Sequence, residues 1–331
     1  MEFGLKPAHG GQNFELTLDQ TIVAEEYGFD SVYFGQHHGF PQGGYWPSPL
    51  VTLSAIATRT SYIRLGTSIL QLPLETPVAL AGQLAQLDVI SDGRVSAAVG
   101  VGWRDREFEA FGVPKAERGP RSTEYLRVLN ALFEPGPTSF SGRFVEFEEF
   151  ELTPRPVQSG GPELLFGGVG NNALRRGVEL ADGINPPGSL PIEELAEFVG
   201  RFRTCSDGRV VITADEVVVR TDTEAARQDA TDKIMRKRRG LVDAEGSSES
   251  YPFGAADIEA FERELERDFD RYAADRTVVV GTPEECTEKI EWIIEETDCD
   301  ELTFRPSTPG WEDAKARETI DRLGQDVLPA L

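Results

Sequence analysis

The sequence predicts an α/β protein built as a (β/α)8 barrel of the TIM type, and three observations support this. Short apolar runs typical of buried strands alternate with helical runs along the whole chain. No Pro/Gly-rich linker divides the chain into two parts. The length of 331 residues fits one such barrel with insertions. We therefore expect a single domain over residues 1–331, with insertions at about 133–160 and 240–256.

The clearest β/α unit lies between residues 63 and 99. Residues 63–70 are mostly apolar and rich in β-branched side chains, which predicts a buried strand. Pro77 opens a helix, where its missing N–H is tolerated, and the helix is expected to end before Asp92-Gly93. A second buried strand, 95–99, runs into Gly100-Val101-Gly102-Trp103. Two apolar strands joined by a helix indicate a parallel sheet.

The other elements follow the same alternation. The remaining barrel strands are expected at 3–5, 31–34, 164–166, 183–185, 210–219 and 301–304. The remaining helices are expected at 16–27, 50–58, 119–132, 172–180, 192–202, 223–239 and 283–296, with a second charged helix before the apolar run 278–280. A hairpin is expected around 140–144 inside the first insertion, and the Gly/Ser/acidic segment 240–256 is predicted to be a mobile loop.

Composition restricts the possible partners and the compartment. The net charge is −24, from 57 acidic and 33 basic residues, and only six of the basic residues are lysines. Such an acidic, lysine-poor surface is typical of a halophile and disfavours binding to nucleic acid or to anionic membranes. No apolar run reaches transmembrane length, and the first residues do not resemble a signal peptide, so we expect a cytoplasmic protein.

The histidines gather at one face of the predicted barrel. His9 follows the first strand, and His37 and His38 follow the second. The active sites of such barrels lie at the carboxyl ends of the strands, and histidine exchanges protons near neutral pH. The three cysteines, Cys205, Cys286 and Cys299, are widely spaced without a CxxC motif, which predicts isolated reduced thiols rather than a disulfide framework or a zinc site.

Phosphate binding is predicted at the turn 167–172, GGVGNN, between the fifth strand and its helix. Backbone N–H groups in a glycine-rich turn and at a helix N-terminus bind phosphate well. Asp88, Asp92 and Arg94 belong to the opposite, stabilising face of the barrel, and Arg118 and Arg176 are expected in surface salt bridges.

Several segments, in order, resemble the bacterial luciferase-like family of flavin-dependent oxidoreductases. They are FDSVYFGQHH (29–38), the stretch 64–112, ERGPRSTEYL (117–126), the stretch 153–183 and VVVGTPEEC (278–286). The resemblance covers most of the chain and implies the same barrel fold. It also implies a small organic substrate, a homodimer and possible dependence on a separate flavin reductase. A light-emitting function is not implied.

The resemblance assigns roles to particular residues. His37 matches the histidine beside the flavin ring and is the catalytic candidate, and Arg121 matches a phosphate-binding arginine. Ser68-Ile69 matches a position where the family often has a non-proline cis peptide behind the flavin. The other candidates for binding the cofactor are Gly100, Gly102, Gly168, Gly170, Asn171 and Asn172. The candidates for lining the substrate pocket are His9, His38, Trp46 and Trp103.

Two departures leave the cofactor open. Gln36 replaces the usual glutamate before His37, and Val101 stands where the luciferases have an arginine. The first hypothesis is a monooxygenase that uses reduced FMN and oxygen, and the second is a dehydrogenase or reductase that uses coenzyme F420. A third is a non-catalytic flavin-binding member of the family. A metal-dependent barrel hydrolase is disfavoured because the chain has too few histidines.

Overall fold

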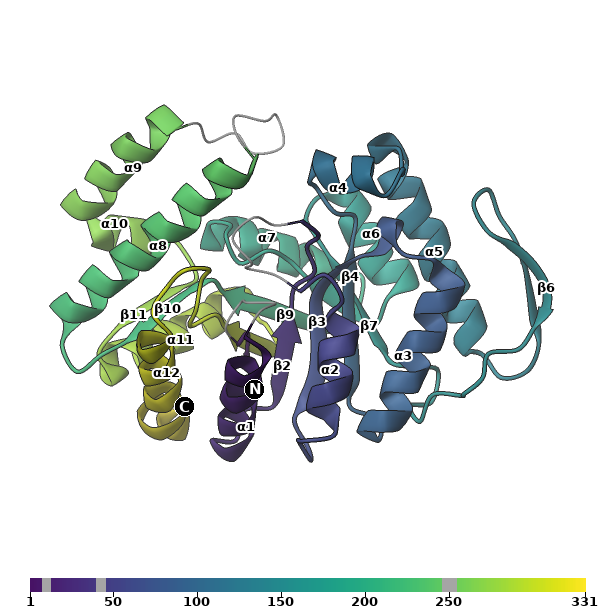
Figure 1. Ribbon diagram of the computed structural model, residues 1–331. Coiled ribbons are helices and arrows are strands. Elements are labelled where there is room, and N and C mark those ends of the chain that lie inside the picture. The colour runs from purple at the N-terminus through teal and green to yellow at the C-terminus, as the bar shows by residue number, and fades with distance from the viewer. Residues whose placement is uncertain (8–12, 40–45, 246–254) are drawn as a thin grey trace.

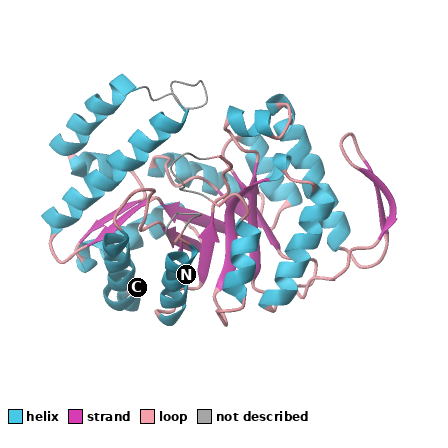
Figure 2. Ribbon diagram, in the orientation of Figure 1, coloured by secondary structure: helices cyan, strands magenta, loops and turns pink. Residues whose placement is uncertain are grey.

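A computed structural model describes residues 1–7, 13–39, 46–245 and 255–331, and it confirms the predicted (β/α)8 barrel. Within these residues, eight parallel strands close into a barrel in the spatial order β1-β12-β9-β8-β7-β4-β3-β2. Helices surround the strands (Figures 1 and 2). The closed order places the carboxyl ends of all eight strands around one opening, which is where the described histidines lie.

The barrel strands are short, as their apolar runs predict. They are β1 (Glu2–Leu5), β2 (Ser31–Phe34), β3 (Arg64–Gln71), β4 (Val95–Gly100), β7 (Glu163–Gly167), β8 (Gly183–Asn185), β9 (Arg209–Ala214) and β12 (Glu301–Phe304). The interior of the barrel is filled by Tyr33, Ala98, Leu165 and Val211, with Ile69 packed against them. A larger apolar core lies between the strands and the helices.

The predicted helices lie close to their expected positions, and two further helices, at Asp105–Ala110 and Asp313–Arg322, were not predicted. The helices are α1 (Phe14–Glu26), α2 (Pro49–Ala57), α3 (Pro77–Ser91), α4 (Asp105–Ala110), α5 (Arg118–Phe133), α6 (Asn171–Leu180), α7 (Ile192–Arg203), α8 (Thr223–Glu245), α9 (Ala255–Arg267), α10 (Phe269–Ala274), α11 (Pro283–Thr297) and α12 (Asp313–Arg322). Pro77 is the first residue of α3, and Asp92 ends that helix in the left-handed conformation with φ 58°. Proline and left-handed residues are typical of these two positions.

The predicted seventh strand, 210–219, is wrong as one element. The chain forms β9 as far as Ala214, bends at Asp215, and continues as β10 (Glu216–Val219) outside the barrel, where β10 pairs with β11 (Val278–Gly281). Both halves are rich in valine and other β-branched residues, and the acidic pair Asp215-Glu216 between them marks the bend. The bend coincides with the half-buried Asp215, whose carboxylate forms a salt bridge with Arg305 at 3.0 Å.

The two insertions have different outcomes. The first contains the predicted hairpin, formed by β5 (Thr138–Ser141) and β6 (Glu146–Phe150), which projects from the barrel in Figure 1. In the second, residues 240–245 continue helix α8, so the predicted loop is wrong there. Residues 246–254 lie outside the described part of the chain. Helices α8, α9 and α10 form a lobe beside the barrel (Figure 1).

Polar groups stabilise the amino-terminal end of the barrel. Asp88 is fully buried and accepts hydrogen bonds from the Val157 and Gln158 backbone N–H groups at 2.8 and 2.9 Å. The Arg94 guanidinium donates to the carbonyl oxygens of Ala57 and Ile63. The prediction that Asp88 and Arg94 are structural is confirmed. In the described residues, no helix is long and apolar enough to cross a membrane.

A buried carboxylate, Glu301, is the centre of this end of the barrel. It is fully buried and accepts hydrogen bonds from Tyr33 Oη at 3.0 Å and from Arg209 Nη2 at 2.8 Å. Arg209 also binds Glu2, whose pKa is lowered to about 2: burial opposes ionisation, but hydrogen bonds from Arg64 and Arg209 outweigh it. These groups lie at or near the first residues of five different strands, so they hold the strand ends together.

Replacing Arg209 by leucine is expected to lower the free energy of unfolding by about 3–5 kcal/mol, because Glu301 would remain buried without its main cation. The measurement is urea unfolding followed by circular dichroism at neutral pH. The control is Arg236→Leu, which removes an exposed salt bridge to Asp232 on α8 and is expected to change stability by about 1 kcal/mol or less. Equal losses in the two variants would contradict the role of Arg209.

Candidate active site

A cavity of about 350 Å³ opens at the carboxyl ends of the barrel strands. His37, the catalytic candidate, lines it, together with Ser68, Ile69, Gly100, Gly102, Trp103 and Gly168 from the predicted set. The other lining residues are Lys6, Gly35, Gln36, Gln71, Val101, Gly167, Asn185, Pro186, Pro187, Gly188, Thr213, Asp215 and Arg305. The barrel therefore brings together many of the residues that the sequence analysis singled out.

His37 is held by a buried carboxylate that the sequence analysis missed. Glu107 on α4 is 1% exposed, and its two oxygens lie 3.1 and 3.2 Å from His37 Nδ1. An ionised carboxylate can only accept, so Nδ1 carries the proton and Nε2 is the other ring nitrogen that can exchange one. The Trp103 ring packs edge-on against His37, with centroids 5.9 Å apart.

Glu107 also fixes the surrounding loop. It accepts hydrogen bonds from the His38 backbone N–H at 2.6 Å and from Gln71 Nε2 at 2.9 Å. Burial opposes ionisation of Glu107, but the contacts with His37, His38 and Gln71 outweigh burial and lower its pKa. The carboxylate is therefore ionised at neutral pH. The glutamate that the family resemblance places at position 36 is absent, and Glu107 supplies a carboxylate from another element.

Gln36 joins the end of β3 to the loop after β2. Its Oε1 accepts the Gln71 backbone N–H at 2.7 Å, and its Nε2 donates to Glu75 at 2.7 Å. Gln71 in turn lines the cavity, and its side-chain oxygen is buried without a hydrogen-bond partner among the described residues. Because Gln71 Nε2 donates to Glu107, this oxygen is an acceptor that a ligand N–H could satisfy.

The Ser68-Ile69 peptide bond is cis, as the family resemblance implies. The Ile69 side chain explains two of the cavity glycines. A Cβ atom at Gly100 would lie 2.8 Å from Ile69 Cδ1, and one at Gly167 would lie 2.5 Å from Ile69 Cγ2. Gly102 has φ +70°, and a Cβ there would lie 2.7 Å from Gln71 Oε1. A side chain at Gly100 or Gly167 would displace Ile69, one at Gly102 would be strained by the positive φ, and glycine at these positions also allows a ligand to approach the backbone.

The predicted phosphate turn leads directly into α6. Gly170 is the N-cap of α6, has φ +87° and provides no side-chain cap. The first turn, with Asn171 and Asn172, therefore presents backbone N–H groups that helix N-termini offer to anions. Gly168, with φ +125°, lines the cavity at the start of this turn.

The arginines near this turn are arranged differently from the prediction. Arg176, expected in a surface salt bridge, is only 7% exposed and donates to the Gly119 carbonyl at 2.9 Å and the Asn172 carbonyl at 3.2 Å. It is buried because it joins the first turns of α5 and α6. Arg121 does not line the cavity; it pairs with Glu117 at 2.9 Å and lies over the Phe144 ring.

The remaining predicted pocket residues lie apart from the cavity lining. His38 packs on Phe111 with ring centroids 4.5 Å apart, and burial lowers its pKa. Trp46 is 6% exposed and packs edge-on against Phe34 in the core. Its backbone pairs with the chain beside Gln36 and His37. His9 lies outside the described residues.

The sequence analysis missed six polar residues of the cavity wall, among them Gln71 and Thr213. Lys6, Asp215 and Arg305 each directly follow a barrel strand, and Asn185 ends one. The rule that singled out His37, a polar residue at the carboxyl end of a strand, could have found these four. Glu107 had a weaker signal, since it lies on a short helix after β4 beside the buried Phe108.

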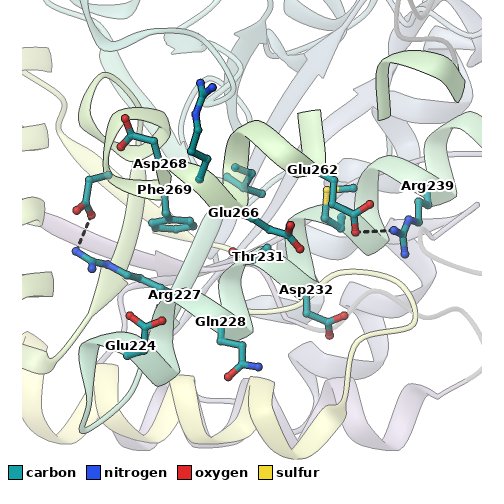
Figure 3. Close-up of a pocket in the computed structure, with 14 residues that line it drawn as sticks. Glu224, Arg227, Gln228, Thr231, Asp232, Arg239, Glu262, Glu266, Asp268 and Phe269 are labelled. Carbon is teal, nitrogen blue, oxygen red and sulfur yellow. Dashed lines mark hydrogen bonds and ion pairs between the residues drawn. The ribbon is translucent and has the colours of Figure 1, made fainter. Parts of the chain in front are cut away.

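A second hollow lies between α8 and the helices α9 and α10 (Figure 3). Its wall is crossed by salt bridges, including Arg227 to Asp270 and Arg239 to Glu262, both at 2.6 Å. It contains none of the residues at the barrel opening. In the described part of the chain, no group of three or more His, Cys, Asp or Glu side chains could hold a metal ion. The chemistry-bearing groups therefore converge on the barrel cavity.

The family model of luciferase-like monooxygenases matches residues 2–299, so the chain belongs to this family. An uncharacterized protein of Sinorhizobium fredii is 31% identical over 160 residues, which span 48% of this chain and 45% of that protein. The FMNH(2)-dependent dimethylsulfone monooxygenase of Pseudomonas putida is 28% identical over 84% of this chain and 75% of its own length. The monooxygenase RslO1 from Streptomyces bottropensis has 25% identity and a TM-score of 0.86, covering 100% of this chain and 99% of that structure.

Replacing Glu107 by glutamine is expected to lower the free energy of unfolding at neutral pH by about 2 kcal/mol, because charge-assisted hydrogen bonds to a buried carboxylate are lost. The pKa of Glu107 is lowered from its ordinary value of 4.5, so this stabilisation is complete above about pH 5 and is lost as pH falls through the folded-state pKa. Chemical denaturation of both proteins from pH 7 to pH 3 checks this. A difference that stays constant over this range would contradict the assignment.

Proposed function

We propose that this protein is a flavin-dependent monooxygenase that uses reduced FMN and molecular oxygen to oxidise a small organic substrate. The observation that carries the proposal is the His37–Glu107 pair, in which the buried Glu107 holds the His37 imidazole at the wall of the cavity at the mouth of the barrel. Membership of the luciferase-like family supports it. The FMNH(2)-dependent relative supports FMN as the cofactor.

The residues of the cavity fit a flavin. The Gln71 oxygen, which has no hydrogen-bond partner among the described residues, would accept an N–H of the ring, and Gly100 and Gly102, which line the cavity, would lie beside the ring. The N-terminus of α6, from Gly168 to Asn172, would hold the phosphate, and Arg121 on α5 remains the proposed phosphate-binding cation. Reduced FMN, when bound, supplies the electrons that activate molecular oxygen.

His37 is the proposed catalytic residue. Its Nδ1 proton is held by Glu107, so Nε2 would be the nitrogen that holds or moves a proton at a group bound in the cavity. Trp103 keeps the imidazole edge against an apolar surface and excludes water from that side. His9, His38 and Trp46 remain proposals for the substrate pocket, and His38 and Trp46 would act through the loop that carries His37.

The proposed reaction consumes reduced flavin, which another enzyme must then supply. We therefore propose a separate flavin reductase as a partner of this protein. We also propose a homodimer in the cytoplasm. From the acidic composition we propose a halophilic source, and each assay buffer therefore contains salt.

The first test is a titration of the purified protein in molar KCl with FMN and, in parallel, coenzyme F420, followed by fluorescence quenching. FMN is expected to bind at least about tenfold more tightly than F420. With FMN supplied reduced by a reductase under 18O2, the label is expected to enter one member of a panel of aldehydes, sulfonates and hydrocarbons. Selective binding of F420 would replace the proposal by hydride transfer, and binding of neither would favour a non-catalytic role.

Replacing His37 by alanine is expected to lower the turnover of any accepted substrate by about 100-fold, because a positioned proton-transfer group is removed. The dissociation constant for FMN is expected to change by about twofold or less, since the proposed flavin contacts are elsewhere. The two quantities are measured separately, by initial rates and by fluorescence titration. Full turnover in the variant would remove His37 from the mechanism.

Replacing Arg121 by alanine is expected to weaken FMN binding by about tenfold and riboflavin binding by about twofold or less, because riboflavin lacks the phosphate. The matched control is Arg322→Ala. That arginine pairs with Glu318 one turn earlier on α12, as Arg121 pairs with Glu117 on α5. The control is expected to leave both affinities unchanged. Equal weakening of FMN and riboflavin by Arg121→Ala would show that Arg121 only stabilises α5.

A further inference from the structure

The wall of the cavity has two chemically different halves. β3, β4 and β7 contribute glycines and the apolar Ile69, whereas β1, β9 and β12 are followed by Lys6, Asp215 and Arg305. The latter three strands are neighbours in the order β1-β12-β9. The glycine half suits the flat flavin ring, so the charged half faces the space left for the substrate.

Lys6 is the most unusual member of the charged half. It is 4% exposed, and its Nζ donates to Ser68 Oγ at 2.7 Å. Ser68 donates to Asn185 Oδ1 at 2.7 Å, and Asn185 Nδ2 donates to the Val211 carbonyl at 2.8 Å. This chain of hydrogen bonds holds the amine at the cavity wall. Within the described residues, no carboxylate forms an ion pair with Lys6, although buried lysines usually need one.

Basic groups exceed acidic groups around this half of the wall. Arg305 pairs with Asp215 at 3.0 Å, and Lys237 lies 3.8 Å from the same carboxylate. Behind them, Lys233 lies 3.6 Å from Glu216. In a protein with a net charge of −24, this local excess of basic groups lies at and behind the wall of the barrel cavity.

We propose that Lys6 and Arg305 form a subsite for an anionic oxygen group, so that the substrate is a small organic anion such as a carboxylate. The inference rests on the proposed function, because it places the flavin against the glycine half. An anionic group would supply the counter-charge that Lys6 lacks and would join Asp215 in binding the Arg305 guanidinium. Asp215 would position Arg305 by holding one edge of its guanidinium.

The protein is also expected to take up a proton when it binds an anion. The pKa of Lys6 is lowered mainly by burial. The positive charges of Arg305 and Lys237 lower this pKa further, whereas the negative charges of Asp215 and Glu301 raise it. A bound anion raises it again, so binding is tighter at low pH and weakens as pH rises. His37 also lines the cavity, so the contribution of Lys6 is the part of the pH dependence that disappears in Lys6→Met.

The test uses benzoate and its neutral analogue benzamide as probes, with isothermal titration calorimetry on the FMN-loaded and the FMN-free protein. Benzoate is expected to bind at least about tenfold more tightly than benzamide, and to lose about tenfold in affinity in Lys6→Met and in Arg305→Met. Benzamide binding is expected to be unchanged. Proton uptake is measured by repeating the titration in two buffers of different ionisation enthalpy. The control, Lys289→Met, removes a partly buried lysine of α11 outside the cavity.

The outcomes separate this inference from the proposed function. Equal affinity for benzoate and benzamide, or unchanged benzoate affinity in both variants, would overturn the subsite. If the variants instead lose affinity for FMN but not for riboflavin, the wall binds the flavin phosphate and the inference is wrong. If the protein binds no flavin but benzoate binds and depends on Lys6, the anion subsite stands and the monooxygenase proposal fails. Circular dichroism confirms that each variant is folded.

Discussion

The geometry of the candidate site depends on the buried carboxylate of Glu107. A buried charge must be compensated by hydrogen bonds or cations, and Glu107 takes its donors from separate segments. The His37 ring and the His38 backbone come from the loop after β2, and the Gln71 amide comes from the end of β3. Because all of them converge on one carboxylate, the loop, the strand and helix α4 are held in one arrangement. That arrangement determines which imidazole nitrogen faces the chemistry.

The distribution of charged residues over the protein also reflects the free-energy cost of burying a charge without a partner. Most acidic residues lie outside the barrel, where water and salt screen their repulsion at little cost. Fewer charged side chains are buried or half-buried in the barrel, and these form groups of opposite charge. Glu301 with Arg209 closes the amino-terminal end of the barrel, and Asp215 with Arg305 lies at the opposite end. The first group is complete, with its carboxylate and cation in contact. In the second group, Lys6 has no carboxylate partner among the described residues. A cluster with all its charges paired suits a structural role, whereas a cluster with an unpaired cation suits the binding of an anionic ligand.

The sequence was sufficient for the fold because the signals for strands and helices are local. The β/α alternation, Pro77 at the start of α3 and Asp92 at its end all follow from periodicity and backbone preference. The same local signal failed at 210–219, because two apolar strands that belong to different sheets look like one strand. It also failed at Arg176. A single arginine on a helix is usually exposed, and only the packing of α5 against α6 buries this one.

What the sequence by itself determined is therefore the barrel, the order of its strands and the face on which His37, Gly100 and Gly102 lie. A residue that follows a strand must lie at the carboxyl end of the barrel, whatever its partners are. Only the tertiary structure decided which of these residues act together. Glu107 lies 70 positions from His37, and Lys6 lies 62 positions from Ser68. Hydrogen bonds and ion pairs depend on the distance and direction of side chains in space, and local sequence periodicity contains no information about contacts between segments so far apart.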